Sequence, residues 1–174
     1  EKEGKIGQKI ALLAVCDQFG IEQATAAREG LKSAGFDIVY DKSYPNTSQD
    51  FAPIIKAAKA ENPDAFVAWS YPSDTFGLAE QAKIEGLNVK AYYSAVGVAF
   101  PTFRGKFGAS AENVLGAGGI QDNPDIRGYY ERHKKVTGVD ADHWGSLLYY
   151  TFLQILEQAM EGVGEVDRAK ITAY

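Results

Sequence analysis

Residues 14–20, AVCDQFG, hold the side chains that come nearest to a reactive set in this sequence. Cys16 is the only cysteine of the chain, and Asp17 follows it directly. A cysteine nucleophile needs a nearby base and an electropositive setting, but the two histidines, His133 and His143, lie far along the chain. We therefore expect Cys16 to be a small buried hydrophobic residue at a strand end. An enzyme that uses Cys16 or Asp17 is the less favoured alternative.

The sequence lacks the motifs that are typical of several other classes of enzyme and binding site. The chain has no G-x-S-x-G elbow, Walker loop or G-x-G-x-x-G motif. One cysteine and two histidines cannot build the usual zinc site, so we expect no metal and no cofactor. The net charge of -5 disfavours a nucleic-acid partner. A receiver domain needs an aspartate after its third strand, where this chain has Trp69, Ser70 and Tyr71.

Aromatic residues and small hydroxyl residues gather at the ends of several apolar runs: Phe19, Trp69, Tyr71, Tyr92, Tyr93 and Phe100, with Ser70, Ser73 and Ser94 among them. Apolar walls with a few polar groups are typical of a pocket for a small molecule. We expect Phe19 and Tyr71 to line such a pocket, and Trp69 and Tyr92 to pack inside the fold.

Apolar runs alternate with helical patterns over the first 120 residues. The runs predict strands at 9–15, 37–44, 64–70, 88–94 and 113–119, and the patterns predict helices at 20–36, 46–63 and 73–87. Such alternation is typical of a parallel sheet that helices cover on both faces. We therefore expect an α/β fold, a doubly wound parallel sheet in the order 2-1-3-4-5. Ligands of such sheets bind beyond the carboxyl ends of the strands.

Polar side chains mark the expected helix starts. Asp17 is expected to cap its helix at Gly20 or to orient the neighbouring backbone, and Thr47 or Ser48 to cap the second helix. Asp74 lies near the start of the third helix, where a carboxylate stabilises the positive end of the helix dipole, so we interpret it as structural.

The pattern changes after Asp125. Helices are predicted at 125–138 and 140–164, another begins in 165–174, and no strand is expected between them. The long helix has a broad apolar face with no sheet to cover. This predicts a missing partner domain, or self-association of the chain.

Three segments together resemble a known family: KIALLAVCDQFG, GFDIVYDKSYPNTSQDFAPIIKAAKAENPDAFVAWSYPSD and QAKIEGLNVKAYYSAVGVAFP. The chain resembles, from about Gly7 to Gly162, the periplasmic solute-binding proteins of ABC transporters of the leucine/isoleucine/valine-binding type. The resemblance implies a type I periplasmic binding fold, with two lobes and a ligand between them. Residues 7–122 would be the carboxyl-side lobe, and residues 123–174 helices that return to the amino-side lobe. The chain would then be a fragment, or would associate with a chain that supplies the rest.

The same resemblance assigns the site. Phe19 and Tyr71 stand where the family has cleft aromatics, with Ser70, Ser94 and Ala95 beside them. Val96 stands where amino-acid binders carry a glutamate for the ligand ammonium. Because a buried ammonium without a carboxylate is costly, an aromatic or aliphatic carboxylic acid is favoured, and a branched-chain amino acid stays open. Trp144 would stack on the ligand or pack within its helix.

The expected function is that of a solute-binding subunit of an ABC importer, which delivers its ligand to a membrane permease and is not an enzyme. With no signal peptide at Glu1 and no run of about 18 apolar residues, we expect a mature periplasmic or extracellular form. The alternative is a ligand-sensing domain of a receptor or regulator with the same fold.

Overall fold

The computed structural model describes residues 6–118, 120 and 122–174. The chain divides into two compact units, Glu1–Ala117 and Gly118–Tyr174. The first unit contains the sheet, and the second consists of helices and the turns that join them. The expected strand 113–119 and the crossing into the second unit touch residues 119 and 121, which lie outside the described residues.

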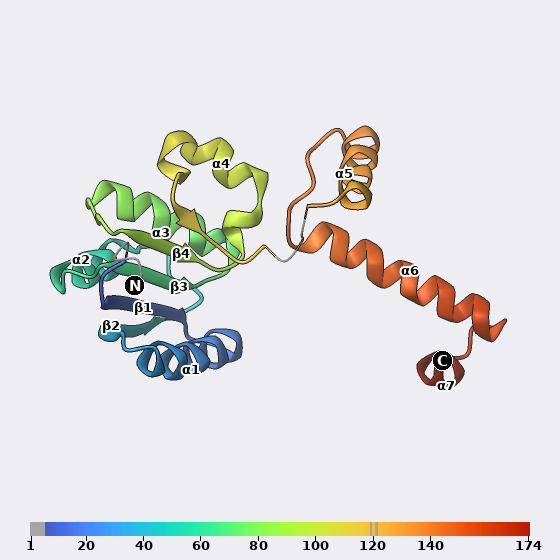
Figure 1. Ribbon diagram of the computed structural model, residues 1–174, viewed down its shortest axis with the longest axis horizontal. Helices are drawn as coiled ribbons and strands as arrows, with labels where there is room; N and C mark the ends of the chain where they lie inside the picture. The colour runs from blue at the N-terminus through green and yellow to red at the C-terminus, as the bar shows by residue number, and fades with distance from the viewer. Residues whose placement is uncertain (1–5, 119, 121) are drawn as a thin grey trace. The chain divides into compact units, whose positions relative to one another are not determined.

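The first unit is built on one parallel sheet of five strands in the order β2-β1-β3-β4-β5, which confirms the predicted order. Figure 1 shows the strands running side by side. Their bounds are Lys9–Val15 for β1, Asp37–Tyr44 for β2, Ala65–Trp69 for β3, Ala91–Ser94 for β4 and Val114–Leu115 for β5. The last strand is shorter than predicted, and Asn113 before it has a left-handed backbone, φ 64°, which a strand cannot contain.

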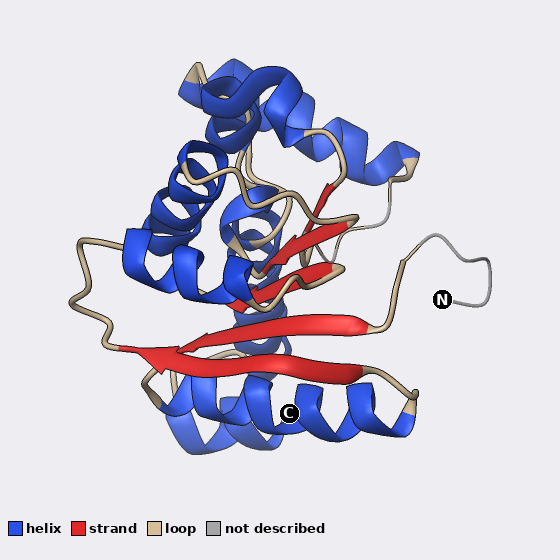
Figure 2. Ribbon diagram, turned by 90° about the vertical axis from the view of Figure 1, so that its left-hand side faces the viewer, coloured by secondary structure: helices blue, strands red, loops and turns tan. Residues whose placement is uncertain are grey.

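Helices cover both faces of the sheet, as Figure 2 shows. Ala11, Leu13 and Val15 pack on α2 (Ala52–Ala60) and α3 (Pro72–Ile84). Leu12 and Ala14 face the other way, toward α1 (Gln18–Ser33). Six successive residues of β1 are therefore buried, as expected for the central strand of a parallel sheet.

Several bounds differ by a few residues from their predictions: β4 begins at Ala91 rather than at residue 88, and α1 and α3 each end three residues earlier than expected. Larger differences concern α2 and α4. α2 does not begin at Thr47 or Ser48, so that prediction is wrong. It begins at Ala52, where Pro53 suits the first turn because it lacks an N–H that would need a partner. The Asp50 carboxylate accepts a hydrogen bond from the Ala52 N–H at 2.9 Å. A further helix, α4 (Pro101–Phe107), lies in a stretch for which no element was predicted, between short 3-10 turns at Gly97–Ala99 and Gly108–Ala111.

The second unit consists of α5 (Pro124–Thr137), α6 (Gly145–Val163) and α7 (Arg168–Ala173). Its described residues contain no strand, as predicted. Tyr129 of α5 packs on Tyr150 of α6, with ring centroids 5.2 Å apart. α6 carries a row of exposed apolar side chains, yet none of the helices in the described ranges has the length and hydropathy that a bilayer crossing requires.

Candidate ligand-binding site

The loops that follow β1, β3 and β4 lie along one edge of the sheet, because the strands are parallel and adjacent in the order β1-β3-β4. The carboxyl ends of these strands and the segments that follow them contain six of the seven residues predicted to contact ligand: Phe19, Ser70, Tyr71, Ser94, Ala95 and Val96. The edge is where ligands of doubly wound sheets bind.

Phe19 and Tyr71 form an aromatic pair at this edge. Their ring centroids lie 5.3 Å apart and the ring planes are inclined by 32°. Phe19 is half-buried against the core, while Tyr71 is 41% exposed. The Tyr71 hydroxyl donates a hydrogen bond to Asp17, and this raises the pKa of Tyr71 above its usual value, so Tyr71 is a neutral phenol. The pair therefore offers an apolar surface with one oriented hydroxyl.

The backbone before Phe19 is fixed by Asp17 and Gly20. The Asp17 carboxylate caps α1 by accepting a hydrogen bond from the Gly20 N–H at 2.9 Å, as predicted. A Cβ at Gly20 would lie 1.9 Å from the Val15 carbonyl oxygen. Only glycine, which has no Cβ, permits this close approach. The turn from β1 into α1, in the segment AVCDQFG, therefore requires glycine at position 20.

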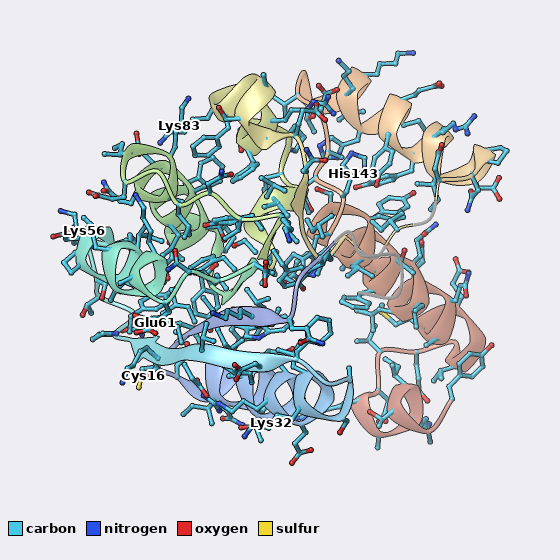
Figure 3. All side chains as sticks on the ribbon, turned by 60° about the vertical axis from the view of Figure 1, so that its left-hand side comes forward. Cys16, Lys32, Lys56, Glu61, Lys83 and His143 are labelled. Atoms are coloured by element: carbon cyan, nitrogen blue, oxygen red, sulfur yellow. The ribbon has the colours of Figure 1, made fainter. Side chains whose placement is uncertain are left out.

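Cys16 is exposed, so the prediction that it is buried is wrong. The buried run of β1 ends at Val15, although the Cys16 N–H still donates to the Tyr44 carbonyl oxygen at 2.7 Å and continues the pairing with β2. Figure 3 shows the Cys16 sulfur at the surface. Within the described ranges, no group of three or more histidine, cysteine or acidic side chains is arranged to hold a metal ion.

Ser70 and Ser94 lie under the site rather than on its surface, since both are fully buried. Ser70 Oγ is 2.8 Å from Thr75 Oγ1 and 3.0 Å from Ser94 Oγ, and Ser94 Oγ donates to Thr75 Oγ1 at 3.1 Å. This hydroxyl cluster of Ser70, Thr75 and Ser94 joins the ends of β3 and β4 to the first turn of α3. No local sequence pattern indicates Thr75, because its partners lie in two other segments.

The β4 loop is held by this cluster and by the backbone. The Ala95 N–H donates to the Ala68 carbonyl oxygen at 3.1 Å, and Ala95 is 2% exposed. A Cβ at Gly97 would meet the Thr75 side chain at 2.6 Å, so the loop lies directly on the cluster. Val96, between these two contacts, is half-buried and carries no charge.

A buried pair that the sequence analysis missed supports the neighbouring loop. The Tyr44 hydroxyl, at the end of β2, donates to Asp74 Oδ2 at 2.9 Å, and Ser73 Oγ donates to Asp74 Oδ1 at 3.2 Å. Burial, followed by the negative charge of Asp74, raises the pKa of Tyr44 well above its usual value. Asp74 lies in the first turn of α3, as predicted.

The two aromatics expected to pack inside the fold do so. Trp69 lies beside Leu12 and Ala14 and packs on Tyr93, with centroids 5.1 Å apart. Tyr92 lies on Phe66, also at 5.1 Å.

Trp144, the seventh predicted residue, lies in the second unit just before α6 and is 37% exposed. Asp142 Oδ1 accepts hydrogen bonds from the N–H groups of Trp144 at 2.9 Å and of Gly145. The neighbouring His143 ring packs on Tyr130, with centroids 5.0 Å apart.

Comparison with known proteins finds several relatives described as Leu/Ile/Val-binding proteins. A Leu/Ile/Val/Thr-binding protein of Salmonella typhimurium is 28% identical over 108 residues, covering 62% of this chain and 29% of the relative. A Leu/Ile/Val-binding protein homologue of Brucella suis is 24% identical over 173 residues, covering 94% of this chain and 43% of the relative. The chain thus spans less than half the length of these curated relatives.

Solved structures share the fold. A leucine-binding protein of Thermotoga maritima superposes with a TM-score of 0.77 at 20% identity, covering 94% of this chain and 47% of that one. An ABC-transporter solute-binding protein of R. palustris in complex with 4-hydroxybenzoate gives a TM-score of 0.84 at 20% identity, covering 99% and 48%. The family model described as periplasmic binding protein matches residues 1–174. The chain therefore belongs to the periplasmic binding protein family, and its 2-1-3-4-5 parallel sheet agrees with the fold that these solved structures share with it.

Proposed function

We propose that this chain forms one lobe of a solute-binding protein of an ABC importer, and that it captures a small carboxylate without chemically changing it. The observation that carries the proposal is the Phe19–Tyr71 pair at the carboxyl edge of a parallel sheet, in a chain of the periplasmic binding protein family. A partly exposed aromatic pair with one oriented hydroxyl suits recognition of a small apolar body.

The proposed arrangement rests on the resemblance to the two-lobed fold of the family, and it agrees with a chain that spans less than half of its curated relatives. Residues 7–122 would form the carboxyl-side lobe, and residues 123–174 the helices that return to the other lobe. A ligand that touches both lobes only when they are closed shifts the equilibrium toward the closed form. Trp144 would stack on the ligand from the returning segment. The proposed location is the periplasm or cell exterior, and the proposed partner is the membrane permease of the importer.

The proposed ligand lacks an amino group. Val96 places an uncharged side chain at the loop where the family's amino-acid binders carry a glutamate. Burial of an ammonium without a carboxylate partner carries a large desolvation cost. The R. palustris neighbour, whose structure is a complex with 4-hydroxybenzoate, supports an aromatic acid, whereas the Leu/Ile/Val-binding relatives support a branched-chain amino acid. Ser70 and Ser94 would act by fixing the loops under the ligand, since their hydroxyls are buried.

A pair of matched ligands tests the proposal. Leucine and 4-methylpentanoate have the same carbon skeleton and differ only in the amino group. Thermal unfolding of a form that carries both lobes is measured with each ligand and with benzoate and 4-hydroxybenzoate. Ligand at 100 times its Kd stabilises by about 2.7 kcal/mol. We expect stabilisation by one or more of the acids and none by leucine. Stabilisation by leucine and not by 4-methylpentanoate contradicts the assignment of Val96.

A gain-of-function variant gives a second test of the same point. Val96→Glu should add the missing carboxylate and move the preference from the acid toward leucine. Val136→Glu adds the same charge at a position that is 84% exposed and should leave the preference unchanged. If neither leucine nor any acid stabilises the protein, the proposed ligand class is wrong.

A further inference from the structure

The edge of the sheet that carries the candidate site also carries two carboxylates of the chain itself. Asp17 caps α1 two residues before Phe19 and is half-buried. Asp74 lies in the first turn of α3, three residues after Tyr71, and is 8% exposed. The two helices that begin beside the Phe19–Tyr71 pair therefore each have a negative side chain at their amino end.

Neither carboxylate is neutralised by a cation. None of the ion pairs among the described residues involves Asp17 or Asp74. The groups that donate to Asp74 are the uncharged hydroxyls of Tyr44 at 2.9 Å and Ser73 at 3.2 Å. The partial positive charge of a helix amino end offsets only part of a full negative charge. The edge beside the aromatic pair is therefore acidic.

Hydrogen-bond donors that an anionic ligand group needs are already occupied at these two helices. The amino end of a helix at this edge of a parallel sheet ordinarily binds an anion. Here Asp17 accepts from the Gly20 N–H at 2.9 Å. α3 begins with Pro72, which has no N–H, and the Thr75 N–H donates to the Tyr71 carbonyl oxygen. The Tyr71 hydroxyl donates to Asp17, so towards a ligand its oxygen can only accept.

We propose that this edge rejects a second negative charge, so that the cleft takes monocarboxylates and excludes dicarboxylates of the same size, with Asp17 as the residue that sets this selectivity. The inference rests on the proposed function. A ligand whose body packs on Phe19 and Tyr71 brings its far end to the Tyr71 hydroxyl and hence to Asp17. An apolar group or a hydrogen-bond donor fits there, whereas a carboxylate meets charges of its own sign. The single carboxylate of the ligand must then point away from Asp17.

Dicarboxylates and their monoamides separate the effect of charge from the effect of size. Terephthalate and 4-carbamoylbenzoate differ only in that an amide replaces one carboxylate, and glutarate and glutaramate form the corresponding aliphatic pair. Both pairs are measured by isothermal titration of the form that carries both lobes. In the pair that the cleft accepts, the monoamide should bind about tenfold or more tightly than the dicarboxylate.

Asp17→Asn isolates the charge of this side chain. Asparagine is also a good N-cap, and its amide oxygen still accepts from Gly20, so the turn is retained. The variant should raise the affinity for the dicarboxylate about three- to tenfold and change the Kd of the monoamide by less than about twofold. Asp37→Asn removes the same charge from the start of β2, at the opposite edge of the parallel sheet, and should leave both affinities unchanged.

Ionic strength provides a further readout, because salt screens repulsion between charges but does not change a steric fit. The preference for the monoamide should therefore shrink as the salt concentration rises. A dicarboxylate that binds as tightly as its monoamide, or a preference that neither salt nor Asp17→Asn reduces, overturns the inference and leaves the proposed function intact. Equal effects of Asp17→Asn and Asp37→Asn overturn the role of Asp17. If no carboxylic acid binds at all, the proposed function is wrong and the inference fails with it.

Discussion

The positions of the exposed side chains in the candidate site are fixed by hydrogen bonds among residues beneath them. Asp17 both caps α1 and accepts from the Tyr71 hydroxyl, so one carboxylate fixes the start of a helix and the direction of a ring. The hydroxyl cluster fixes Ser70, next to Tyr71, and Ser94, next to Ala95. Asp17 and the hydroxyl cluster, which lie beneath the exposed residues of the site, therefore fix their positions.

The Tyr71 ring and the Tyr71 hydroxyl are expected to contribute separately to ligand affinity. Tyr71→Ala removes the aromatic surface and should weaken binding of the proposed carboxylate by about tenfold or more, as should Phe19→Ala. Tyr71→Phe keeps the ring, so it should change the Kd by less than Tyr71→Ala does. Isothermal titration of the three variants measures this. Equal losses for Tyr71→Phe and Tyr71→Ala would show that the hydroxyl, not the ring, contacts the ligand.

Thr75 is expected to stabilise the lobe through the hydroxyl cluster. Thr75→Val preserves shape but leaves the buried Ser70 and Ser94 hydroxyls with one partner fewer, which should cost about 1–3 kcal/mol of unfolding free energy. Urea unfolding measures the change. Thr102→Val makes the same substitution at an exposed position of α4 and should be nearly neutral. A similar small effect for both variants would show that the hydroxyl cluster does not stabilise the lobe.

Residue-level prediction from sequence succeeded where one segment decides the outcome. The Asp17 cap needs only the neighbouring Gly20, and it was predicted. The burial of Cys16 depends on what lies beyond the end of β1, and that prediction was wrong. The Ser70–Thr75–Ser94 cluster and the Tyr44–Asp74 pair join separate segments, so local patterns could not indicate them.

At the level of elements, the turn from β1 into α1 is the tightest junction beside the site. Gly20→Ala should destabilise the first unit by about 1–3 kcal/mol, because the new Cβ would meet the Val15 carbonyl oxygen at 1.9 Å and the backbone must shift. The shift should also displace Phe19. Gly30→Ala is the control, since a Cβ there would have no atom within 4 Å. Chemical unfolding compares them, and equal stability of the two variants would contradict the close approach.

The start of α6 is expected to depend on pH. Burial opposes the charged form of Asp142, but hydrogen bonds from Ser146 and from the N–H groups of Gly145, Trp144 and Ser146 outweigh it and lower the pKa. A carboxylate with a lowered folded pKa stabilises above its unfolded pKa, about 4, and this stabilisation is lost as pH falls through the folded value. Amide hydrogen exchange at Gly145 and Ser146 should therefore gain an opening contribution below about pH 4, beyond the intrinsic pH dependence of exchange.

Asp142→Asn provides the control for this pH effect. The amide oxygen still accepts hydrogen bonds but does not titrate, so the pH-dependent opening of the first turn should disappear. If the turn opens over the same pH range in this variant, another group is responsible.

Element boundaries were predictable where an apolar run and its flanking turns agree. The bounds of β1 and β2 match their predictions, since each run is closed by polar or proline residues. α2 begins later than expected because Pro53, rather than a hydroxyl side chain, fits its first turn. α4 was missed because seven residues with an internal glycine give too little periodicity to indicate a helix.

At the scale of the whole molecule, α6 carries more exposed large apolar side chains than any other element of the described chain. Apolar side chains with 41–66% exposure occupy nearly every position from 148 to 156, namely Leu148, Tyr149, Tyr150, Phe152, Leu153, Ile155 and Leu156. Positions this closely spaced cover all sides of a helix. A helix that is apolar all round is typical of the interior of a larger protein, which agrees with a chain that spans less than half of its curated relatives.

We therefore expect the 174-residue chain to self-associate through α6 when it is studied alone. Sedimentation velocity should show species whose average mass rises with concentration, because exposed apolar area of this extent favours association. Tyr149→Lys with Leu153→Lys places two charges one helical turn apart on α6 and should return the chain to monomer. Val136→Lys with Val166→Lys adds the same charge outside α6, at positions 84% and 82% exposed, and should leave the association intact. A chain that sediments as a monomer at all concentrations would mean that α6 is covered within the chain itself, and would remove the argument that this helix belongs to a larger protein.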